Sequence, residues 1–542
     1  MPCAKHNIVT DGRGFMTKGI DKYSIDSTDY TIGQDNVQKW GFDVHNAVFT
    51  TSAGLTILFI IAILVTDPVT AKSALDGIKN SIINNFDSLF IMAGNFFVLF
   101  CLGMIVSPFG KIRLGGDDAK AEHSYLSWLA MLFAAGMGIG LMFWSVAEPA
   151  AYFTDWYGTP LNVAANTPEA QRMALGATMY HWGLHPWAIY AVVALSLAFF
   201  TYNKGLPLSI RSVFYPILGD RAWGWAGHII DILAVLATLF GLATSLGFGA
   251  QQAASGISHI FGIESGVGLQ LIVIAVVTAL AGISVYRGID GGVKLVSNIN
   301  MIAAFILLVF VGGVSFSIVS HTIPETLMSY VENIIPLSNP FNRPDEEWMH
   351  GWTVFYWAWW MSWSPFVGMF IARVSRGRTV REFLIAVLLI PTIITVVWMG
   401  TFGGIGIDQL INKVGMLGQQ GFNDATMAMF EMFDALPFSQ IISMIAVCLV
   451  LVFFISSSDS GSLVIDSITA GGKVDAPVPQ RMFWAFIEGA VAMALLWVGG
   501  SNAIGALQAA AISTALPFVF VLIVMCISLV LGMRTEPKPV KK

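Results

Sequence analysis

The sequence predicts an all-α integral membrane protein with twelve transmembrane helices, arranged as two five-helix inverted repeats preceded by two extra helices. Of the 542 residues, 56% are hydrophobic and 11% are charged, and the mean hydropathy is +0.71. No soluble domain has such a composition. Apolar stretches of spanning length recur along the chain. Two of these stretches, five spans apart, carry helix-interrupting residues, and paired interruptions at corresponding positions are typical of inverted-repeat transporters.

The predicted spans follow one another with mostly short connections. In chain order they cover residues 47–66, 88–108, 126–148, 175–201, 228–256, 267–285, 296–320, 351–372, 382–404, 439–458, 482–499 and 509–532. The chain therefore divides into an N-terminal segment (1–46), two peripheral helices (47–108), a first repeat (126–320), an outer helix and loop (321–349), a second repeat (350–532) and a short tail (533–542).

The outer helix is predicted from Ile323, Leu327, Val331 and Ile334, which follow helical spacing. An amphipathic helix lying along the extracellular or periplasmic surface has this pattern.

The basic residues set the orientation of the chain in the membrane. If residues 1–46 are cytoplasmic, all lysines and arginines fall on that side except Lys72, Lys79, Arg172, Arg343 and Lys413. Both termini are therefore predicted to be cytoplasmic.

Composition also argues against several classes of function. Three of the four cysteines fall within predicted spans, so neither a disulfide framework nor a metal site is expected. The net charge of −6 is spread along the chain, which indicates no nucleic-acid partner. The intramembrane acids Asp231 and Glu488 are isolated in the sequence. We therefore expect no enzyme and no cofactor.

Span three carries three glycines in five residues, at Gly136, Gly138 and Gly140. Gly136 and Gly140 alone would fit close helix packing. Gly138 lies about 200° round the helix from either of them, and every glycine lowers helix stability. An unwound stretch whose carbonyls face a cavity explains all three, although close packing remains an alternative.

Span eight packs five tryptophans into the twelve residues from Trp352 to Trp363. Trp352 and Trp357 fit an interfacial belt. The later tryptophans, from Trp359 onward, lie roughly 10 to 17 Å deeper than Trp352, near the middle of a ~30 Å core. Aromatic faces at that depth are suited to a quaternary ammonium or similar onium group. Pro365, which follows directly, is expected to interrupt the helix.

Two further spans complete this predicted site. In span four, Trp187 and Tyr190 share a helical face and can close an aromatic box with span eight, although a packed aromatic core is the alternative. In span ten, a run of serines begins at Ser456 and Ser457. These hydroxyls either hold helices together or, facing the unwound carbonyls of span three, form an all-oxygen sodium site.

Four motifs closely resemble the betaine/choline/carnitine transporter family over about residues 45–532. They are Gly-Met-Gly-Ile-Gly (136–140), Ser-Val-Ala-Glu-Pro (145–149), His-Trp-Gly-Leu-His-Pro-Trp-Ala-Ile-Tyr (181–190) and Trp-Ala-Trp-Trp-Met-Ser-Trp-Ser-Pro-Phe-Val-Gly (357–368). The resemblance implies the inverted-repeat fold with two extra helices, a homotrimer, and transport of onium compatible solutes across a bacterial cytoplasmic (inner) membrane.

The resemblance also implies site residues. The substrate-binding residues that it implies are Gly136, Met137, Gly138, Gly140, Trp182, Trp187, Tyr190, Trp359, Trp360 and Trp363. One sodium site corresponds to Ala134, Met137, Phe453, Ser456 and Ser457. A second corresponds to Thr238 and Phe366, but Leu242 stands where sodium-coupled relatives have a hydroxyl.

The mode of transport follows from other positions in the resemblance. Span five has no basic residue from Asp231 to Gln252, and Val367 stands where sodium-independent exchangers have methionine. Gly140 stands where choline carriers tend to have an acid. The expected function is sodium symport of a zwitterion, glycine betaine or dimethylsulfoniopropionate, by alternating access, with sodium as the coupling ion. A proton-coupled or exchange-type carrier of choline or carnitine is the alternative.

Overall fold

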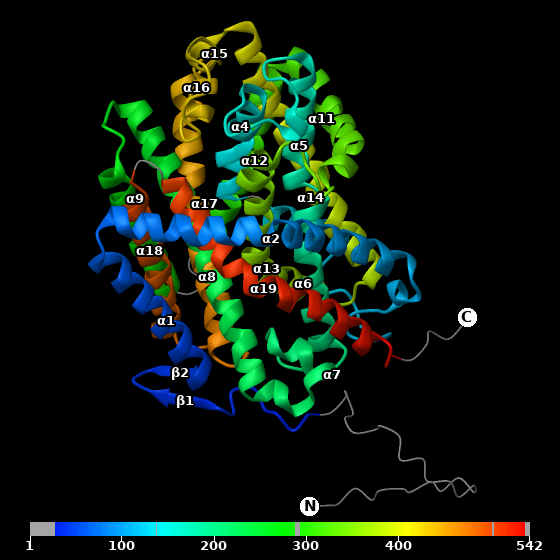
Figure 1. The fold of residues 1–542 in the computed structure, drawn as a ribbon. Helices are drawn as coiled ribbons and strands as arrows, with labels where there is room; N and C mark the ends of the chain where they lie inside the picture. Colours follow the sequence, from blue (N-terminus) through cyan, green and yellow to red (C-terminus); the bar gives the residue numbers. More distant parts are fainter. Residues whose placement is uncertain (1–27, 137, 288–292, 501–502, 537–542) are drawn as a thin grey trace, which may run out of the picture.

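The computed structural model describes residues 28–136, 138–287, 293–500 and 503–536, and its long helices form a tall bundle (Figure 1). The predicted all-α membrane class is confirmed. Within the described ranges, strands are confined to one antiparallel hairpin, β1 (Asn36–Lys39) and β2 (Phe42–His45), in which Asn36 pairs with His45.

The helices of the N-terminal half are α1 (Asn46–Val65), α2 (Pro68–Val106), η1 (Pro108–Lys111), α3 (Tyr125–Gly136), α4 (Ile139–Thr154), η2 (Pro160–Asn162), α5 (Pro168–Trp182), α6 (Leu184–Tyr202), η3 (Arg211–Phe214), α7 (Tyr215–Leu218), η4 (Gly219–Trp223), α8 (Trp225–Phe261), α9 (Val267–Arg287) and α10 (Val293–Val314). Those that follow are α11 (Phe316–Leu337), α12 (Glu346–Trp348), η6 (Met349–Val354), α13 (Phe355–Val374), α14 (Val380–Asn412), α15 (Gly415–Gln420), α16 (Ala428–Phe433), α17 (Ser439–Thr469), α18 (Val478–Gly499) and α19 (Ala503–Met533).

Ten helical stretches among the described residues are long and apolar enough to cross a membrane. The two predicted spans outside that set are 126–148 and 351–372, which correspond to α3 with α4 and to α13. The first is divided into two short helices, and α4 has only 16 residues. Indole N–H groups and serines make α13 less apolar. The count of twelve spans therefore stays a prediction.

The predicted interruption of span three is confirmed. Gly138 has φ −167° and ψ −174°, an extended conformation that separates α3 from α4. The structure also divides predicted span four, where Gly183 separates α5 from α6. This second break was not predicted from the sequence. Its local cause is Pro186, which is tolerated in the first turn of α6 but would remove a hydrogen bond from a continuous helix.

The predicted interruption of span eight is wrong, because α13 runs unbroken from Phe355 to Val374 through Pro365. Proline removes the N–H group that would bind the Met361 carbonyl. The Ser364 hydroxyl donates to that carbonyl instead, over 2.7 Å. The interfacial role for Trp352 and Trp357 is also wrong, since both side chains are buried.

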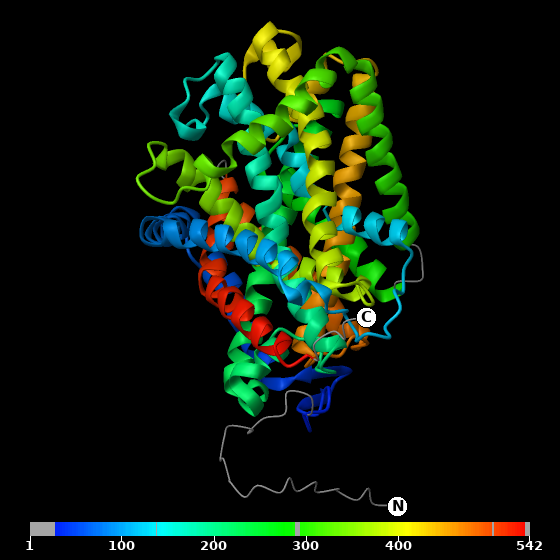
Figure 2. The ribbon, with the colours of Figure 1, turned by 90° about the vertical axis from the view of Figure 1, so that its right-hand side faces the viewer.

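Helices of the two halves pack in reciprocal pairs. α6 packs against α13 and α14 packs against α4, while α8 packs against α19 and α17 against α10. The equivalent helices α8 and α17 contact each other, as do α9 and α18. Two repeats related by a twofold axis produce such a pattern. α2 lies across this core and contacts α19 and α6 (Figures 1 and 2).

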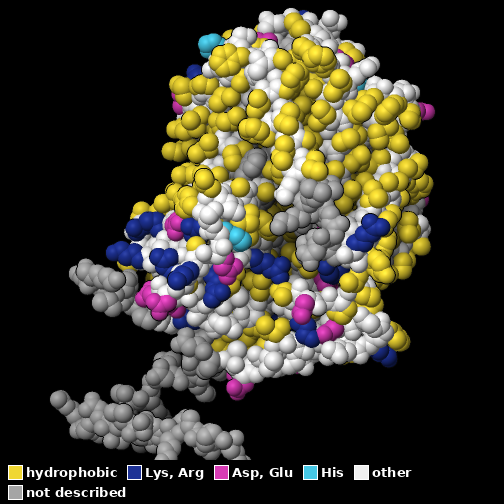
Figure 3. Space-filling view, turned by 180° about the vertical axis from the view of Figure 1, so that it is seen from behind, with side chains coloured by type: hydrophobic (Ala, Val, Ile, Leu, Met, Phe, Trp, Pro, Cys, Tyr) yellow, Lys and Arg dark blue, Asp and Glu magenta, His cyan; other side chains and the backbone are white. Residues whose placement is uncertain are grey.

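The outer surface is apolar over most of its height. In Figure 3, hydrophobic side chains cover the upper and middle parts of one face, whereas lysine, arginine and acidic side chains gather towards its lower edge. Both ends of the described chain lie near that edge. Tyr30 accepts a hydrogen bond from Arg211 over 2.7 Å, and Glu536 forms an ion pair with Lys204 over 2.7 Å. The two ends thus share one side of the molecule.

The predicted outer helix corresponds to α11. Its polar face packs on the protein, where Thr322 donates to the Gly400 carbonyl and Ser329 donates to the Arg172 carbonyl, each over 2.6 Å. The predicted apolar stripe is divided: Leu327 is 48% and Val331 65% exposed, whereas Ile323 and Ile334 are half-buried against the core. Leu327 and Val331 therefore face whatever surrounds the protomer.

Candidate functional site

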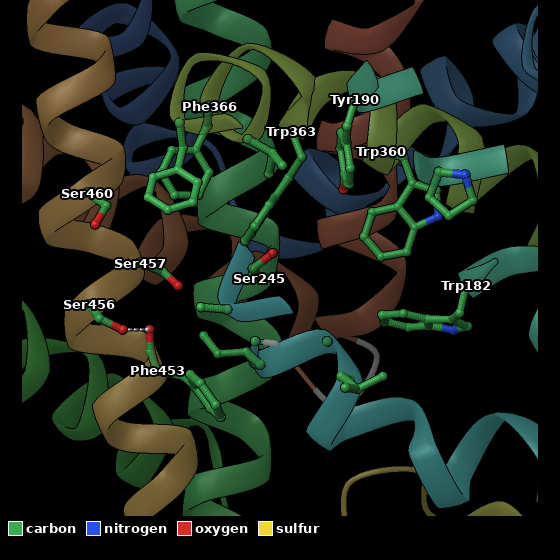
Figure 4. A pocket seen from close by; sticks show the side chains of 18 of the residues that line it. Trp182, Tyr190, Ser245, Trp360, Trp363, Phe366, Phe453, Ser456, Ser457 and Ser460 are labelled. Atoms are coloured by element: carbon green, nitrogen blue, oxygen red, sulfur yellow. Dashed lines mark hydrogen bonds between the residues drawn. The ribbon is translucent and has the colours of Figure 1, made fainter. Parts of the chain in front are cut away.

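A cavity of about 270 Å³ lies between helices of the two halves of the chain, and Figure 4 shows it from close by. The α3–α4 break, α5, α6, α8, α10, α13, α14 and α17 all contribute to its wall. Its lining residues are Ala134, Gly138, Ile139, Gly140, Leu141, Trp182, Pro186, Trp187, Tyr190, Ser245, Ser297, Asn300, Met301, Trp359, Trp360, Trp363, Phe366, Val367, Phe370, Thr395, Phe453, Ser456, Ser457 and Ser460.

One side of the cavity is an aromatic box. The rings of Trp182 and Trp360 meet edge to face, with centroids 4.9 Å apart at 72°. Tyr190 lies 6.2 Å from Trp360 and 5.5 Å from Trp187, between ring centroids. The Trp360 N–H group donates to the His181 carbonyl over 2.9 Å. Because the N–H group is occupied by the backbone, the indole contributes its apolar faces to the cavity.

Trp359 has a different position in this box. It stacks with Trp360 at 4.6 Å and with Phe355 at 5.5 Å between centroids, and only 1% of its surface is exposed. Its N–H group donates to Ser245 over 3.2 Å. Trp359 therefore supports the ring of Trp360 more than it offers a face of its own.

Gly140 permits the close approach of the two aromatic walls. A Cβ atom at this position would lie 2.8 Å from the Trp359 ring and 2.9 Å from the Trp182 ring. Contacts this short force a neighbouring group to move. The glycine is thus required by the packing of the box, in addition to any effect of charge at this position.

The opposite side of the cavity is rich in oxygen. In Figure 4, Phe453, Ser456, Ser457 and Ser460 lie along α17, across the cavity from Trp182. The Ser456 hydroxyl donates to the Phe453 carbonyl over 3.1 Å. Neutral hydroxyl and carbonyl oxygens are ligands suited to hard cations such as sodium.

This cavity brings together most of the residues selected from the sequence. Those that line it are Ala134, Gly138, Gly140, Trp182, Trp187, Tyr190, Trp359, Trp360, Trp363, Phe366, Phe453, Ser456 and Ser457. Gly136 is the last residue of α3. Met137 lies outside the described residues.

The second predicted sodium site is less well formed. Thr238 is fully buried and is not among the lining residues, and its hydroxyl donates to the Ala234 carbonyl one turn earlier over 2.7 Å. The buried Leu242 side chain packs against Gly461, so closely that a Cβ atom added at Gly461 would lie 2.3 Å from Cδ1 of Leu242. The site therefore offers aliphatic surface where a second hydroxyl was expected.

Several polar lining residues were not selected from the sequence, namely Ser245, Ser297, Asn300 and Thr395, whereas Ser460 belongs to the serine run of span ten. Asn300 also donates to the Leu449 carbonyl over 3.3 Å. These residues lie in small polar groups within long apolar stretches, namely Thr244-Ser245, Ser297-Asn298-Ile299-Asn300 and Thr392 to Thr395. The available signal was these polar side chains at membrane depth, where polar residues tend to face the bundle interior or a cavity.

An all-helical bundle with a central cavity between two halves, beside a broken helix, defines a membrane carrier of small solutes. Residues 47–538 match the family described as BCCT, betaine/carnitine/choline family transporter. The chain therefore belongs to this family, as its motifs predicted.

Relatives of known name agree with this membership. The chain is 75% identical over 521 residues to glycine betaine transporter 1 of Vibrio parahaemolyticus, covering 96% of this chain and 100% of that protein. It is 65% identical over 522 residues to a glycine betaine/proline/choline/ectoine transporter of the same species, covering 96% and 93%. A glycine betaine transporter of Acinetobacter baylyi is 40% identical over 497 residues, covering 91% and 74%.

Proposed function

We propose that this protein is a secondary active symporter that imports glycine betaine, or the similar zwitterion dimethylsulfoniopropionate, together with sodium by alternating access. One observation carries the proposal: a single cavity has an aromatic box on one side and serine hydroxyls on the other, with a broken helix between them. The names of the relatives favour glycine betaine as the first solute to test.

The two ends of the zwitterion meet different parts of the cavity. The onium head packs against the rings of Trp182, Trp360 and Tyr190, where desolvation strengthens the cation–π interaction. The carboxylate meets the start of α4, because Ile139, Gly140 and Leu141 line the cavity in the first turn of that helix. N–H groups in a first turn lack intrahelical partners and lie at the positive end of the helix dipole.

The coupling ion binds at the other end of the broken helix. Ala134 lies in the last turn of α3, where carbonyl groups lack helical partners and the helix dipole is negative. Its carbonyl, the Phe453 carbonyl and the hydroxyls of Ser456 and Ser457 provide oxygen ligands for sodium. A cation and a carboxylate held at the two ends of one break stabilise each other, and this coupling is what symport requires.

The proposal includes orientation and assembly. Basic side chains gather on the side where both described ends lie, so that side is cytoplasmic in the inner membrane of a bacterium. We include the homotrimer because the family resemblance implies it. The exposed apolar side chains of α11, among them Leu327 and Val331, provide a surface for contact with lipid or with neighbouring protomers.

Uptake of radiolabelled glycine betaine into proteoliposomes tests the proposal. An inward sodium gradient should drive accumulation, and replacing sodium by potassium should reduce it to background. Ser456→Ala with Ser457→Ala should raise the sodium concentration for half-maximal uptake. Ser462→Ala is the matched control, since this hydroxyl donates to the Asp459 carbonyl and does not line the cavity. Full accumulation driven by a proton gradient without sodium would favour the proton-coupled alternative.

A further inference from the structure

A buried carboxylate lies directly behind the aromatic box. Glu148, on α4, is fully buried and does not line the cavity. Its Oε2 accepts from the Trp182 N–H group over 2.6 Å and from the Tyr356 hydroxyl over 2.5 Å. Its Oε1 accepts from the Tyr152 hydroxyl over 2.8 Å and lies 2.9 Å from Nδ1 of His181. In the sequence, Glu148 stood out only as part of a motif.

The partners of this carboxyl group are all able to donate. An indole N–H is only a donor, and the two tyrosines offer phenolic hydroxyls. Nε2 of His181 lies 3.0 Å from the Thr353 hydroxyl, so a neutral His181 can accept from Thr353 and donate from Nδ1 to Glu148. In this tautomer four donors meet two oxygens, as an ionised carboxylate requires, although the Tyr152 hydroxyl also lies 3.0 Å from Nδ1 of His181.

Trp182 connects this carboxylate to the cavity. Its N–H group is bound to Glu148, while its ring lines the cavity and meets Trp360 edge to face. The far edge of the same ring is the one that a Cβ atom at Gly140 would strike. A hydrogen bond from the indole to an anion fixes the ring and raises the electron density on its face, which strengthens attraction for a cation.

We infer that Glu148 is a positioning residue that orients Trp182 and supplies, through that ring, the negative charge that selects an onium head over a neutral group of equal shape. The inference rests on the proposed function, because it concerns the same solute site. It differs from a purely structural role in one respect. A structural network would support every solute equally, whereas a buried charge favours cationic heads and disfavours anionic molecules.

Glycine betaine and its isostere 3,3-dimethylbutanoate separate these roles, since the second has a tert-butyl group in place of the trimethylammonium head. In proteoliposomes, wild type should prefer glycine betaine strongly. Glu148→Gln retains the shape and removes the charge. It should raise the half-saturating concentration of glycine betaine about tenfold, while inhibition by 3,3-dimethylbutanoate should stay constant or become stronger. Ser145→Ala is the control, because Ser145 is buried on the same helix and donates within it.

A second variant keeps the inference testable if Glu148→Gln does not fold. Trp182→Phe keeps an aromatic face but has no N–H group to bind Glu148, so it should also reduce the preference for glycine betaine over the isostere. When both single variants fold, the double variant should lose less of the preference for glycine betaine than the two single variants lose in sum, since Glu148 acts through Trp182.

Three results overturn the inference. The first is a preference for glycine betaine over 3,3-dimethylbutanoate that is unchanged in Glu148→Gln. The second is an equal loss of affinity for both solutes in either single variant, and the third is a double variant whose loss equals the sum of the two single losses. The proposed function fails separately. If wild type does not accumulate glycine betaine, the function is wrong, whereas wild-type uptake together with any of these three results rejects only the role of Glu148.

Discussion

Individual side chains in the cavity wall differ in what they offer to a solute. Trp360 lines the box with its indole N–H group bound to a carbonyl, and 6% of its surface is exposed. Trp359, beside it in the sequence, stacks with Phe355 and Trp360 and is 1% exposed. Both tryptophans line the cavity, but Trp360 faces the aromatic box whereas Trp359 mainly supports the ring of Trp360.

Trp360→Leu should weaken glycine betaine binding by about 2 kcal/mol, roughly thirtyfold in affinity, because a desolvated cation–π face is lost. Equilibrium binding to purified protein measures this effect. Trp360→Phe is the matched variant, since it retains an aromatic face and should lose much less. An affinity for Trp360→Leu equal to that of wild type would remove Trp360 from the box.

Substitution of Gly140 separates steric from electrostatic effects. Gly140→Ala places a Cβ atom against the rings of Trp182 and Trp359. It should therefore weaken the binding of glycine betaine and of choline alike, by about 1 kcal/mol or more. Gly140→Asp adds a carboxylate beside the start of α4, which repels the carboxylate of glycine betaine and attracts choline.

Competition assays compare the preference for glycine betaine over choline. We expect wild type and Gly140→Ala to prefer glycine betaine by at least roughly tenfold, and Gly140→Asp to narrow or reverse that preference by about 1.4 kcal/mol. If Gly140→Asp behaves like Gly140→Ala, the position acts through packing alone.

Among single residues, the prediction that the tryptophans from Trp359 onward lie deep in the span agrees with the cavity lining, because tryptophans that only anchor a span lie at its two ends. That these tryptophans bind the solute stays a prediction. Ser245 and Asn300 were not predicted, because the few polar residues around them in α8 and α10 follow no periodic pattern and form no recognisable motif. The partners of Glu148 were not predicted either. These come from α4, α5 and α13, and only the tertiary structure brings those helices together.

At the level of helices, proline and glycine had different effects from those expected. Pro365 was predicted to interrupt α13, but Ser364 satisfies the carbonyl of Met361 and the helix continues. Gly183 was not predicted to interrupt, yet it separates α5 from α6. A proline or glycine destabilises the helix only locally. Neighbouring hydrogen-bond donors and side-chain packing decide whether the helix ends at that residue.

Ser364→Ala should lower the free energy of unfolding by about 1 kcal/mol or more, because the buried carbonyl of Met361 loses its donor. Thermal melting of detergent-solubilised protein measures the effect. In Ser364→Ala with Pro365→Ala, the new N–H group at position 365 can bind Met361, so most of the loss should be recovered. A double variant as unstable as Ser364→Ala would contradict this account of the helix.

Helix lengths were predicted less well than helix positions. α2 begins at Pro68, twenty residues before the predicted span, and α17 continues to Thr469, beyond the predicted end at 458. Hydropathy locates the segment inside the bilayer, whereas a helix continues for as long as its backbone and caps allow. Asp67 caps α2 by accepting from Thr70 over 3.0 Å, which sets its start.

Across the whole molecule, the N-terminal hairpin joins segments that are distant in the sequence. Asn36 donates to the Ala470 carbonyl over 2.9 Å, and Asp43 forms an ion pair with Lys473 over 2.5 Å. The buried Arg211, at the start of η3, binds Nε2 of His45 at the end of the hairpin and the Tyr30 hydroxyl just before it. The hairpin therefore fastens the first repeat to the end of α17 on the side where both described ends lie.

His45, the last residue of this hairpin, should make stability depend on pH. Burial, with the nearby positive charge of Arg211 and the ring of His228, lowers the pKa of His45 to about 3. Arg211 donates to Nε2 of His45 over 3.2 Å, which requires the neutral ring, and Asp35 lies 4.0 Å away on the exposed side. In the unfolded chain the pKa returns to about 6.5.

Between those two values the unfolded chain binds a proton that the folded protein does not bind, so stability falls as pH decreases below about 6.5 and is unaffected above it. The loss should reach about 1.4 kcal/mol for each pH unit below that value. Melting temperatures of wild type and His45→Gln, measured from pH 7.5 to 5.5, test this. His45→Gln should show a weaker decline at acidic pH, whereas His321→Gln, which changes an exposed histidine on α11, should behave as wild type. An equally steep decline in His45→Gln would show that other groups control the acid stability of this protein.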